Sequence, residues 1–208
     1  MPPKFTEAER VRITDALRAA GYELFTTQGI RKTSIDELVS SAGIAKSSFY
    51  VFFESKEHLY LELMIRQAPE IGRKLLPAAQ EAPDARTGLV NLFTRSWELT
   101  DADPLYRRLI KHPEDLKLVH RRVMTDEEIA RVHPHIMRPM IEFIEHWQDE
   151  GQLVAADPRV VLGVFRAASL IAQHADEFGE LYPQVAELLK HAVAAGLTVA
   201  QAEGENQS

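Results

Sequence analysis

Apolar residues recur at spacings of three and four along nearly the whole chain of 208 residues, and no other feature constrains the fold as strongly. Ile13, Leu17, Ala20 and Leu24 follow this spacing near the N-terminus, which is typical of a helix that buries one face. Strand-like alternation between turn residues is scarce. The pattern therefore predicts an all-α fold.

Composition narrows the class of protein further. Hydrophobic residues make up 45% and charged residues 26% of the chain, as in a globular protein rather than a disordered one. The sequence contains no run of about 18 apolar residues, so it predicts no membrane span. The N-terminus is polar and has no signal-peptide core, so we expect a cytoplasmic protein with no membrane partner. Cysteine is absent, which excludes disulfides, thiolate metal sites and cysteine nucleophiles.

Charge is distributed unevenly along the chain. The formal net charge is −7, yet residues 1–60 hold equal numbers of basic and acidic side chains, so the remaining residues carry the whole excess. An acidic protein is a poor indiscriminate binder of nucleic acid. A neutral N-terminal part still permits binding through one small, well-placed surface.

The N-terminal part carries signals for three helices. A first helix is predicted for about residues 6–27. Ser34 and Glu37 have the spacing of a capping box and open a short helix that ends at Ala42-Gly43. Another short helix follows over about residues 45–53. Two short helices joined by a tight turn make a helix-turn-helix, whose second helix has the width of a DNA major groove.

Longer elements follow. Ser55 is predicted to cap the next helix, which Pro69 and Gly72 are expected to bend or interrupt. Near the C-terminus, two helices over roughly residues 158–178 and 183–201 carry wide apolar faces.

The second helix of the helix-turn-helix has two different sides. At 100° per residue, Phe49, Phe52 and Phe53 point one way and are expected to be core. Short hydroxyls, a phenol, an ammonium and a valine lie on the rest of its circumference, and these groups suit phosphate and base-edge contacts. They belong to Lys46, Ser47, Ser48, Tyr50 and Val51. A helical hairpin with a polar exterior remains the alternative interpretation.

About fifty residues of this region closely resemble the N-terminal domain of the tetracycline-repressor (TetR) family of bacterial regulators. Spacing and residue type agree at Ala20, Leu24-Phe25, Gly29, Thr33-Ser34-Ile35, Leu38, Ala42-Gly43-Ile44, Ser48-Phe49-Tyr50, Phe53, Ser55-Lys56-Glu57 and Leu59. Residues 61–208 match that family only in general character. Two positions depart from its usual pattern, because Ala45 stands where a capping hydroxyl is common and Val39 where alanine is favoured.

The resemblance implies a homodimer that binds a palindromic DNA operator and is released by a small apolar effector. It implies a three-helix DNA-binding domain over residues 1–54, a connecting helix over 55–80 and a helical ligand-binding and dimerisation domain over 81–202, followed by a frayed tail, 203–208. Phosphate contacts are implied for Thr33, Ser48, Tyr50 and Lys56. Base-edge contacts are implied for Lys46, Ser47 and Val51.

Methionine and aromatic side chains suit an adaptable apolar pocket, although plain core packing is the competing interpretation. The predicted pocket residues, including two histidines as polar groups, are Phe93, Trp97, Tyr106, His112, Met124, Met137, Met140, Phe143 and His174. The dimer interface of the family uses the last two helices. Here it is predicted to contain Val161, Phe165, Ala168, Val185, Leu189 and Val193.

Other chemistry has little support in the sequence. No common catalytic or phosphate-binding motif occurs, so we expect neither an enzyme nor a cofactor. The pair His133-Pro134-His135 does not have the spacing of a metal site on one helix face. Two alternatives stay open beside a ligand-responsive repressor: a DNA-binding architectural or activator protein without an effector, and an all-α enzyme.

Overall fold

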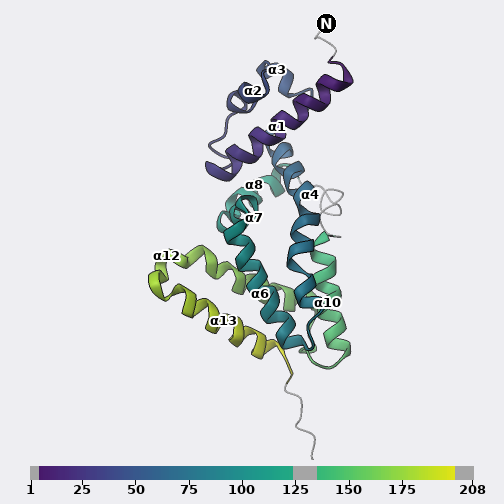
Figure 1. The fold of residues 1–208 in the computed structure, drawn as a ribbon, viewed down its shortest axis with the longest axis vertical. Helices are drawn as coiled ribbons and strands as arrows, with labels where there is room; N and C mark the ends of the chain where they lie inside the picture. Colours follow the sequence, from purple (N-terminus) through teal and green to yellow (C-terminus); the bar gives the residue numbers. More distant parts are fainter. Residues whose placement is uncertain (1–4, 124–134, 200–208) are drawn as a thin grey trace, which may run out of the picture. The chain divides into compact units, whose positions relative to one another are not determined.

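The computed structural model describes residues 5–123 and 135–199, and the predicted all-α fold is confirmed (Figure 1). The α-helices are α1 (Glu7–Thr27), α2 (Ile35–Ala42), α3 (Lys46–Phe49), α4 (Lys56–Leu75), α5 (Pro77–Gln80), α6 (Ala85–Ala102), α7 (Pro104–Lys111), α8 (Pro113–Val123), α10 (Met137–Asp149), α11 (Pro158–Ser169), α12 (Ala175–Phe178) and α13 (Tyr182–Leu197). Short 3-10 helices cover Leu170–His174 and Gly179–Leu181. Within the described residues, β-pairing is limited to one isolated bridge, Leu153 with Thr198.

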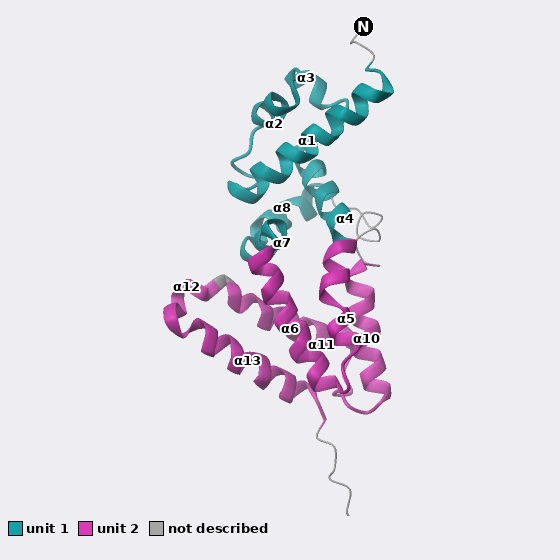
Figure 2. Cartoon of the chain, in the orientation of Figure 1, with its two compact units in different colours: residues 1–68, 103–132 teal, residues 69–102, 133–208 magenta. Residues whose placement is uncertain are grey.

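The chain divides into two compact units (Figure 2). Residues 1–68 and 103–132 form the N-terminal unit, and residues 69–102 and 133–208 form the C-terminal unit. This division differs from the predicted domains, because α7 and α8 group with the helix-turn-helix instead of with a ligand domain. Leu105 of α7 and Val119 of α8 are fully buried in the same apolar cluster as the helix-turn-helix core. None of the described helices has the length and apolar character needed to span a membrane.

Local signals account for the first two helices. Thr6 with Glu9 caps α1, and Ser34 with Glu37 caps α2; both are reciprocal capping boxes. The Ser34 backbone N–H and hydroxyl both donate to Glu37 at 2.7 Å, and these bonds hold the pKa of Glu37 below its usual range. Gly43 ends α2 at φ +66°, in the left-handed region that favours glycine. The capping box predicted at Ser34 is confirmed.

The recognition segment, residues 45–53, is less regular than predicted. Only Lys46–Phe49 is α-helical, and the backbone N–H groups of Val51 and Phe52 donate to carbonyls three residues earlier, at 3.1 and 2.9 Å. The backbone of Ala45 is extended, as at an N-cap, but its side chain has no atom that could accept a hydrogen bond from the first turn. A helix this short, without a side-chain cap, is not stable by itself. The segment therefore depends on tertiary packing.

Two further boundaries correct the sequence analysis. Helix α4 runs without interruption from Lys56 to Leu75 with Pro69 inside it, because a proline removes one backbone donor while the rest of the ladder persists. The helix predicted for 158–178 is instead broken. Helix α11 ends at Ser169, whose buried hydroxyl donates to the Phe165 carbonyl at 2.9 Å, and a 3-10 turn follows.

In the C-terminal unit, α6, α11 and α13 pack against one another, and α10 packs on α11. Aromatic rings fill the centre of this arrangement. The Phe93 ring of α6 lies 4.5 Å from the Phe165 ring of α11 and 5.7 Å from the Trp97 ring, centroid to centroid. These contacts give the unit a core of its own.

Replacement of Phe49 by alanine tests the dependence of the recognition segment on packing. Phe49 is fully buried, and truncation of a buried phenylalanine costs about 3–5 kcal/mol. We expect Phe49→Ala to lower the free energy of unfolding by this amount in urea denaturation followed by circular dichroism. Val51→Ala, at an exposed position two residues away, serves as the control and should stay within about 0.5 kcal/mol of wild type.

Ala45→Ser tests the missing cap. The backbone of Ala45 already has φ −71° and ψ 150°, so a serine there can accept a hydrogen bond from the first turn. We expect the N-terminal unit to gain about 1 kcal/mol in free energy of unfolding. Ala45→Val, which supplies no acceptor, should give no gain; equal gains in both variants would contradict this explanation.

Candidate nucleic-acid interface

The recognition segment presents an apolar side to its own unit. Phe49 is fully buried and Phe53 is buried at 9% exposure. Phe52 is half-buried and packs on the Phe5 ring at 5.3 Å, with the Arg10 guanidinium 5.7 Å from its ring centroid. The three rings therefore face the unit, as the helical period predicts, although Phe52 lies at its margin.

The opposite side faces outward. Tyr50 is 55% and Val51 44% exposed, and Lys46 and Ser47 are also exposed, whereas Ser48 is half-buried. Two large, partly apolar side chains next to a short hydroxyl are unusual on the exposed side of a small helix. This combination offers a phenol and a hydroxyl for phosphates and a branched methyl surface for a thymine methyl group.

Lys46 is held by a weak surface contact. Its Nζ donates to Asp36 Oδ2 of α2 at 2.8 Å, which raises the pKa of Lys46 above its usual value. Both side chains are more than half exposed. An exposed ion pair of this kind contributes little to stability, so the ammonium is available to exchange its carboxylate for another acceptor.

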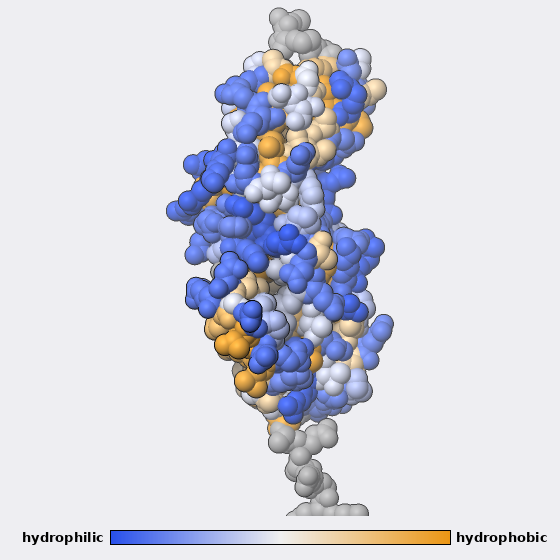
Figure 3. Space-filling model, turned by 60° about the vertical axis from the view of Figure 1, so that its left-hand side comes forward, coloured by the Kyte–Doolittle hydropathy of each residue, from blue (hydrophilic) through white to orange (hydrophobic). Residues whose placement is uncertain are grey.

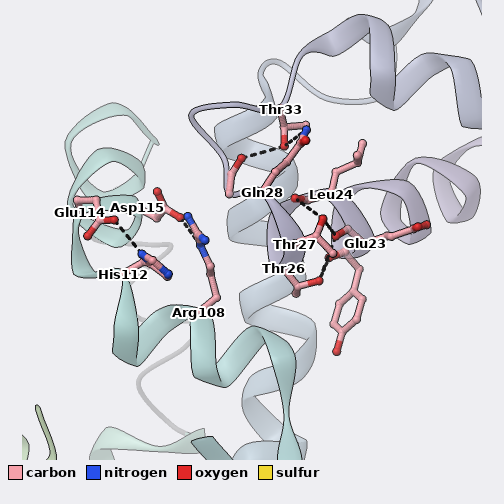
Figure 4. A network of polar contacts seen from close by, with 12 residues as sticks. Glu23, Leu24, Thr26, Thr27, Gln28, Thr33, Arg108, His112, Glu114 and Asp115 are labelled. Atoms are coloured by element: carbon pink, nitrogen blue, oxygen red, sulfur yellow. Dashed lines mark hydrogen bonds and ion pairs between the residues drawn. The ribbon is translucent and has the colours of Figure 1, made fainter. Parts of the chain in front are cut away.

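Thr33 does not fit the role implied for it. The residue is 1% exposed, and its hydroxyl donates to the Gly29 carbonyl at 2.9 Å (Figure 4). Its side chain therefore has no exposed polar atom for a phosphate, and we leave Thr33 out of the contact set. Its carbonyl instead accepts from Lys56 Nζ at 2.7 Å, which places the Lys56 ammonium at the start of α4 beside the loop before α2.

Sequence reasoning missed two ion pairs of this unit, one that connects α8 to the start of α4 and one that connects α7 to α8. Arg122 donates to Glu57, which is 4% exposed and next to Lys56, at 2.8 Å. Arg108 donates to Asp115, which is 1% exposed, at 2.7 Å (Figure 4). No sequence signal marks these pairs, because isolated charges on predicted helices are usually solvated.

Gly29 shows how closely α7 approaches the turn after α1. Its φ of +83° favours glycine, and an added Cβ would lie 1.9 Å from Arg108 Nη2. The positive φ explains why glycine occupies this position, and the Arg108 guanidinium lies where a side chain would begin.

The predicted pocket residues do not gather at one place. Phe93, Met140 and Phe143 are buried and Trp97 and Met137 half-buried in the C-terminal unit, whereas Tyr106 and His112 belong to α7 and its end in the N-terminal unit. His174 is exposed and pairs with Glu177 at 2.9 Å. Met124, together with His133 and Pro134, lies outside the described residues.

A pocket of about 200 Å³ lies elsewhere, between Phe52, Phe53 and α4 in the N-terminal unit.

The predicted dimer residues separate into two groups. Val161 and Phe165 are core residues of their own unit, at 1% and 6% exposure, while Ala168, Val185, Leu189 and Val193 are half-buried. The apolar side chains that point outward are Val160, Val164, Leu170, Leu181 and Leu188. Figure 3 shows hydrophobic surface over the C-terminal unit on the face that it presents. The wide apolar faces made neighbouring positions indistinguishable in the sequence.

Lys190 is a further residue that sequence reasoning missed. Buried positions on α13 follow helical spacing at Ala186, Lys190, Ala194 and Leu197. The sequence does contain a signal for its burial, because Lys190 stands at helical spacing among apolar residues.

Comparisons with known proteins agree with this site. The model of the family described as "Bacterial regulatory proteins, tetR family" matches residues 17–63, which contain α2, α3 and the start of α4. The HTH-type transcriptional repressor KstR2 of Rhodococcus jostii (strain RHA1) is 30% identical over 115 residues, which are 53% of this chain and 56% of that protein. The chain thus matches about half the length of the curated relatives.

Solved structures share the fold over most of the chain. A TetR family transcription regulator from Marinobacter aquaeolei VT8 has a TM-score of 0.66 at 16% identity, covering 93% of this chain and 99% of that one. RolR in complex with its ligand resorcinol has a TM-score of 0.62 at 14% identity, covering 93% and 91%. The N-terminal part of the chain is therefore similar to the tetR family of bacterial regulatory proteins, and the chain shares the fold of a solved TetR family regulator.

Proposed function

We propose that this protein is a repressor that binds a palindromic operator as a homodimer and leaves the DNA when a small molecule occupies its C-terminal unit. The observation that carries the proposal is the exposed side of the recognition segment. Ser47, Tyr50 and Val51 point outward there because Phe49 and Phe53 are buried behind them. The family model covers the same residues.

The contacts divide into two kinds. Tyr50, Ser48 and Lys56 contact phosphates, and the N-terminal end of α4 supports the Lys56 contact through its partial positive charge. Lys46, Ser47 and Val51 face the base edges. The neutral charge of residues 1–60 within an acidic chain supports a specific surface rather than general attraction to DNA.

The outward apolar residues of α11 and α13 support the homodimer. Val160 is 58% and Leu188 73% exposed, and clusters of exposed large apolar side chains mark interaction sites more often than they mark free surface. We assign the interface to this outward set and remove Val161 and Phe165 from it.

The named relatives support repression and an effector. KstR2 is a transcriptional repressor by name, and the solved structure of RolR holds resorcinol as its ligand. For this chain, effector binding and operator binding are then linked, so each must weaken the other by the same factor. An unchanged effector affinity in the presence of operator would favour a DNA-binding protein without an effector.

Two substitutions separate phosphate contacts from base contacts in a gel-shift assay with the DNA upstream of the protein's own gene. Lys56→Ala should weaken binding to all sequences and lower the salt slope by about one. Val51→Ala should instead change the preference among operator variants by about 1–3 kcal/mol at one base pair. Wild-type binding that ignores sequence would contradict the proposal, and circular dichroism controls for the fold of each variant.

Charge placed on the outward apolar surface tests the homodimer. We expect the wild-type protein to have the mass of a dimer in size-exclusion chromatography with light scattering, and Leu188→Asp to shift it to the monomer, because an interface buries this side chain. Val11→Asp is the matched control, since Val11 is 54% exposed on α1. A wild-type monomer, or a Leu188→Asp variant that remains a dimer, would remove this surface from the interface.

A further inference from the structure

Lys190 is an unusual residue in the C-terminal unit. It is 7% exposed, and among the described residues of that unit no other charged side chain is buried. Its Nζ lies 3.2 Å from Thr94 Oγ1 and 6.0 Å from the centroid of the Trp97 ring. A helix of mostly small and apolar residues thus brings an ammonium to the aromatic side of α6.

The ammonium has no buried counter-charge within the described part of the unit. Its ion-pair partner is Glu187, at 2.7 Å on the same helix, and that carboxylate is 60% exposed and shared with His191 at 3.0 Å. The buried carboxylates of the N-terminal unit differ, since Glu57 and Asp115 each pair with an arginine. A buried charge without a buried partner is costly to stability, and natural proteins break such rules most often at functional sites.

The indole ring that lies under the ammonium carries a donor without a partner. The Trp97 Nε1 atom is buried and has no hydrogen-bond partner. Indole N–H and ammonium groups are both donors only, so neither can satisfy the other. The indole N–H calls for an acceptor, and the ammonium, whose carboxylate partner Glu187 is exposed, can exchange that partner for another. An anionic oxygen is the acceptor that forms the strongest hydrogen bonds with such groups.

The surroundings define the rest of the ligand. The Trp97 ring continues into Phe93 and Phe165, where α6 and α11 meet α13. Phe93 and Phe165 are buried core residues, so a site opened among these rings is aromatic and apolar and suits a flat or hydrocarbon body rather than a sugar or a nucleotide.

We propose that the effector is a carboxylic acid with an apolar body, whose carboxylate is received by Lys190 Nζ and Trp97 Nε1 and whose body replaces contacts among Phe93, Trp97 and Phe165. This proposal rests on the proposed function in one respect only, namely that the ligand of the C-terminal unit is the effector. Glu187 is the exposed carboxylate that the ligand displaces from the ammonium.

Binding is tested by isothermal titration calorimetry on the full-length protein without DNA. Two matched pairs of probes differ only in charge: phenylacetate with phenylacetamide, and cinnamate with cinnamamide. We expect each acid to bind about tenfold to a hundredfold more tightly than its amide, the range that a hydrogen-bonded charge provides. Lys190→Met should reduce the affinity for the acid to that for the amide and leave the amide unchanged. Lys74→Met, at a half-exposed lysine of the same unit, should change neither.

Tryptophan fluorescence locates the acid. In a Trp147→Phe background, the remaining Trp97 should respond to the acid. In a Trp97→Phe background, Trp147 should not respond, although its Nε1 is also buried without a partner. The melting temperature of Lys190→Met should be unchanged or higher, because apolar replacement of a poorly paired buried charge is often neutral or stabilising.

Several results would overturn the proposal: amides that bind as tightly as the acids, an acid preference that persists in Lys190→Met, acids that fail to bind at millimolar concentration, or a lower melting temperature of Lys190→Met. The last result would mark Lys190 as a structural support of α13. A wild-type protein that binds no DNA in the gel-shift assay would instead contradict the proposed function and leave the carboxylate site intact.

Discussion

The burial of Phe49 and Phe53 is the constraint on which the candidate interface depends. Helix α3 has four residues and no side-chain cap, so its own hydrogen bonds do not hold it in one orientation. The two rings do so by joining the core of the N-terminal unit. Because side chains follow the helical period, fixing these rings on one side places Ser47, Tyr50 and Val51 on the other.

Buried charge is used differently in the two units. In the N-terminal unit, Glu57 and Asp115 are paired with arginines: Arg122 of α8 pairs with Glu57 at the start of α4, and Arg108 of α7 pairs with Asp115 of α8. Removal of one partner would leave an uncompensated charge, so these pairs fix geometry. Among the described residues, Lys190 of the C-terminal unit has no buried carboxylate as its partner. We therefore interpret it as a ligand-binding group.

The two proposals fit one physical scheme. In that scheme, the acidic chain with its neutral N-terminal part would bind DNA through one shaped surface, to which the start of α4 would contribute Lys56. The same helix continues through Pro69 to Leu75, across the point where the chain passes from one unit to the other. A ligand that changes the packing of the C-terminal unit therefore has a continuous helix through which it can influence the DNA-binding side chains.

The sequence by itself determined the features that depend on neighbours in the chain. The capping box at Ser34, the glycine ends at Gly29 and Gly43 and the inward side of the recognition segment all follow from spacing and backbone preference, and the structure contains them. The resemblance to the tetR family also follows from the sequence, because the motif lies within about fifty consecutive residues.

Only the tertiary structure decided the features that depend on distant residues. The wide apolar face of α11 makes Val160 and Val161 equivalent in the sequence, and the packing of α11 within its unit selected Val161 for the core and left Val160 outside. The burial of Thr33 and the ion pair between Arg122 and Glu57 both depend on residues far away in the sequence, and no periodic pattern predicts such contacts. Helical period specifies which side a residue faces along its own helix, whereas the neighbour on that side is set by the packing of the whole unit.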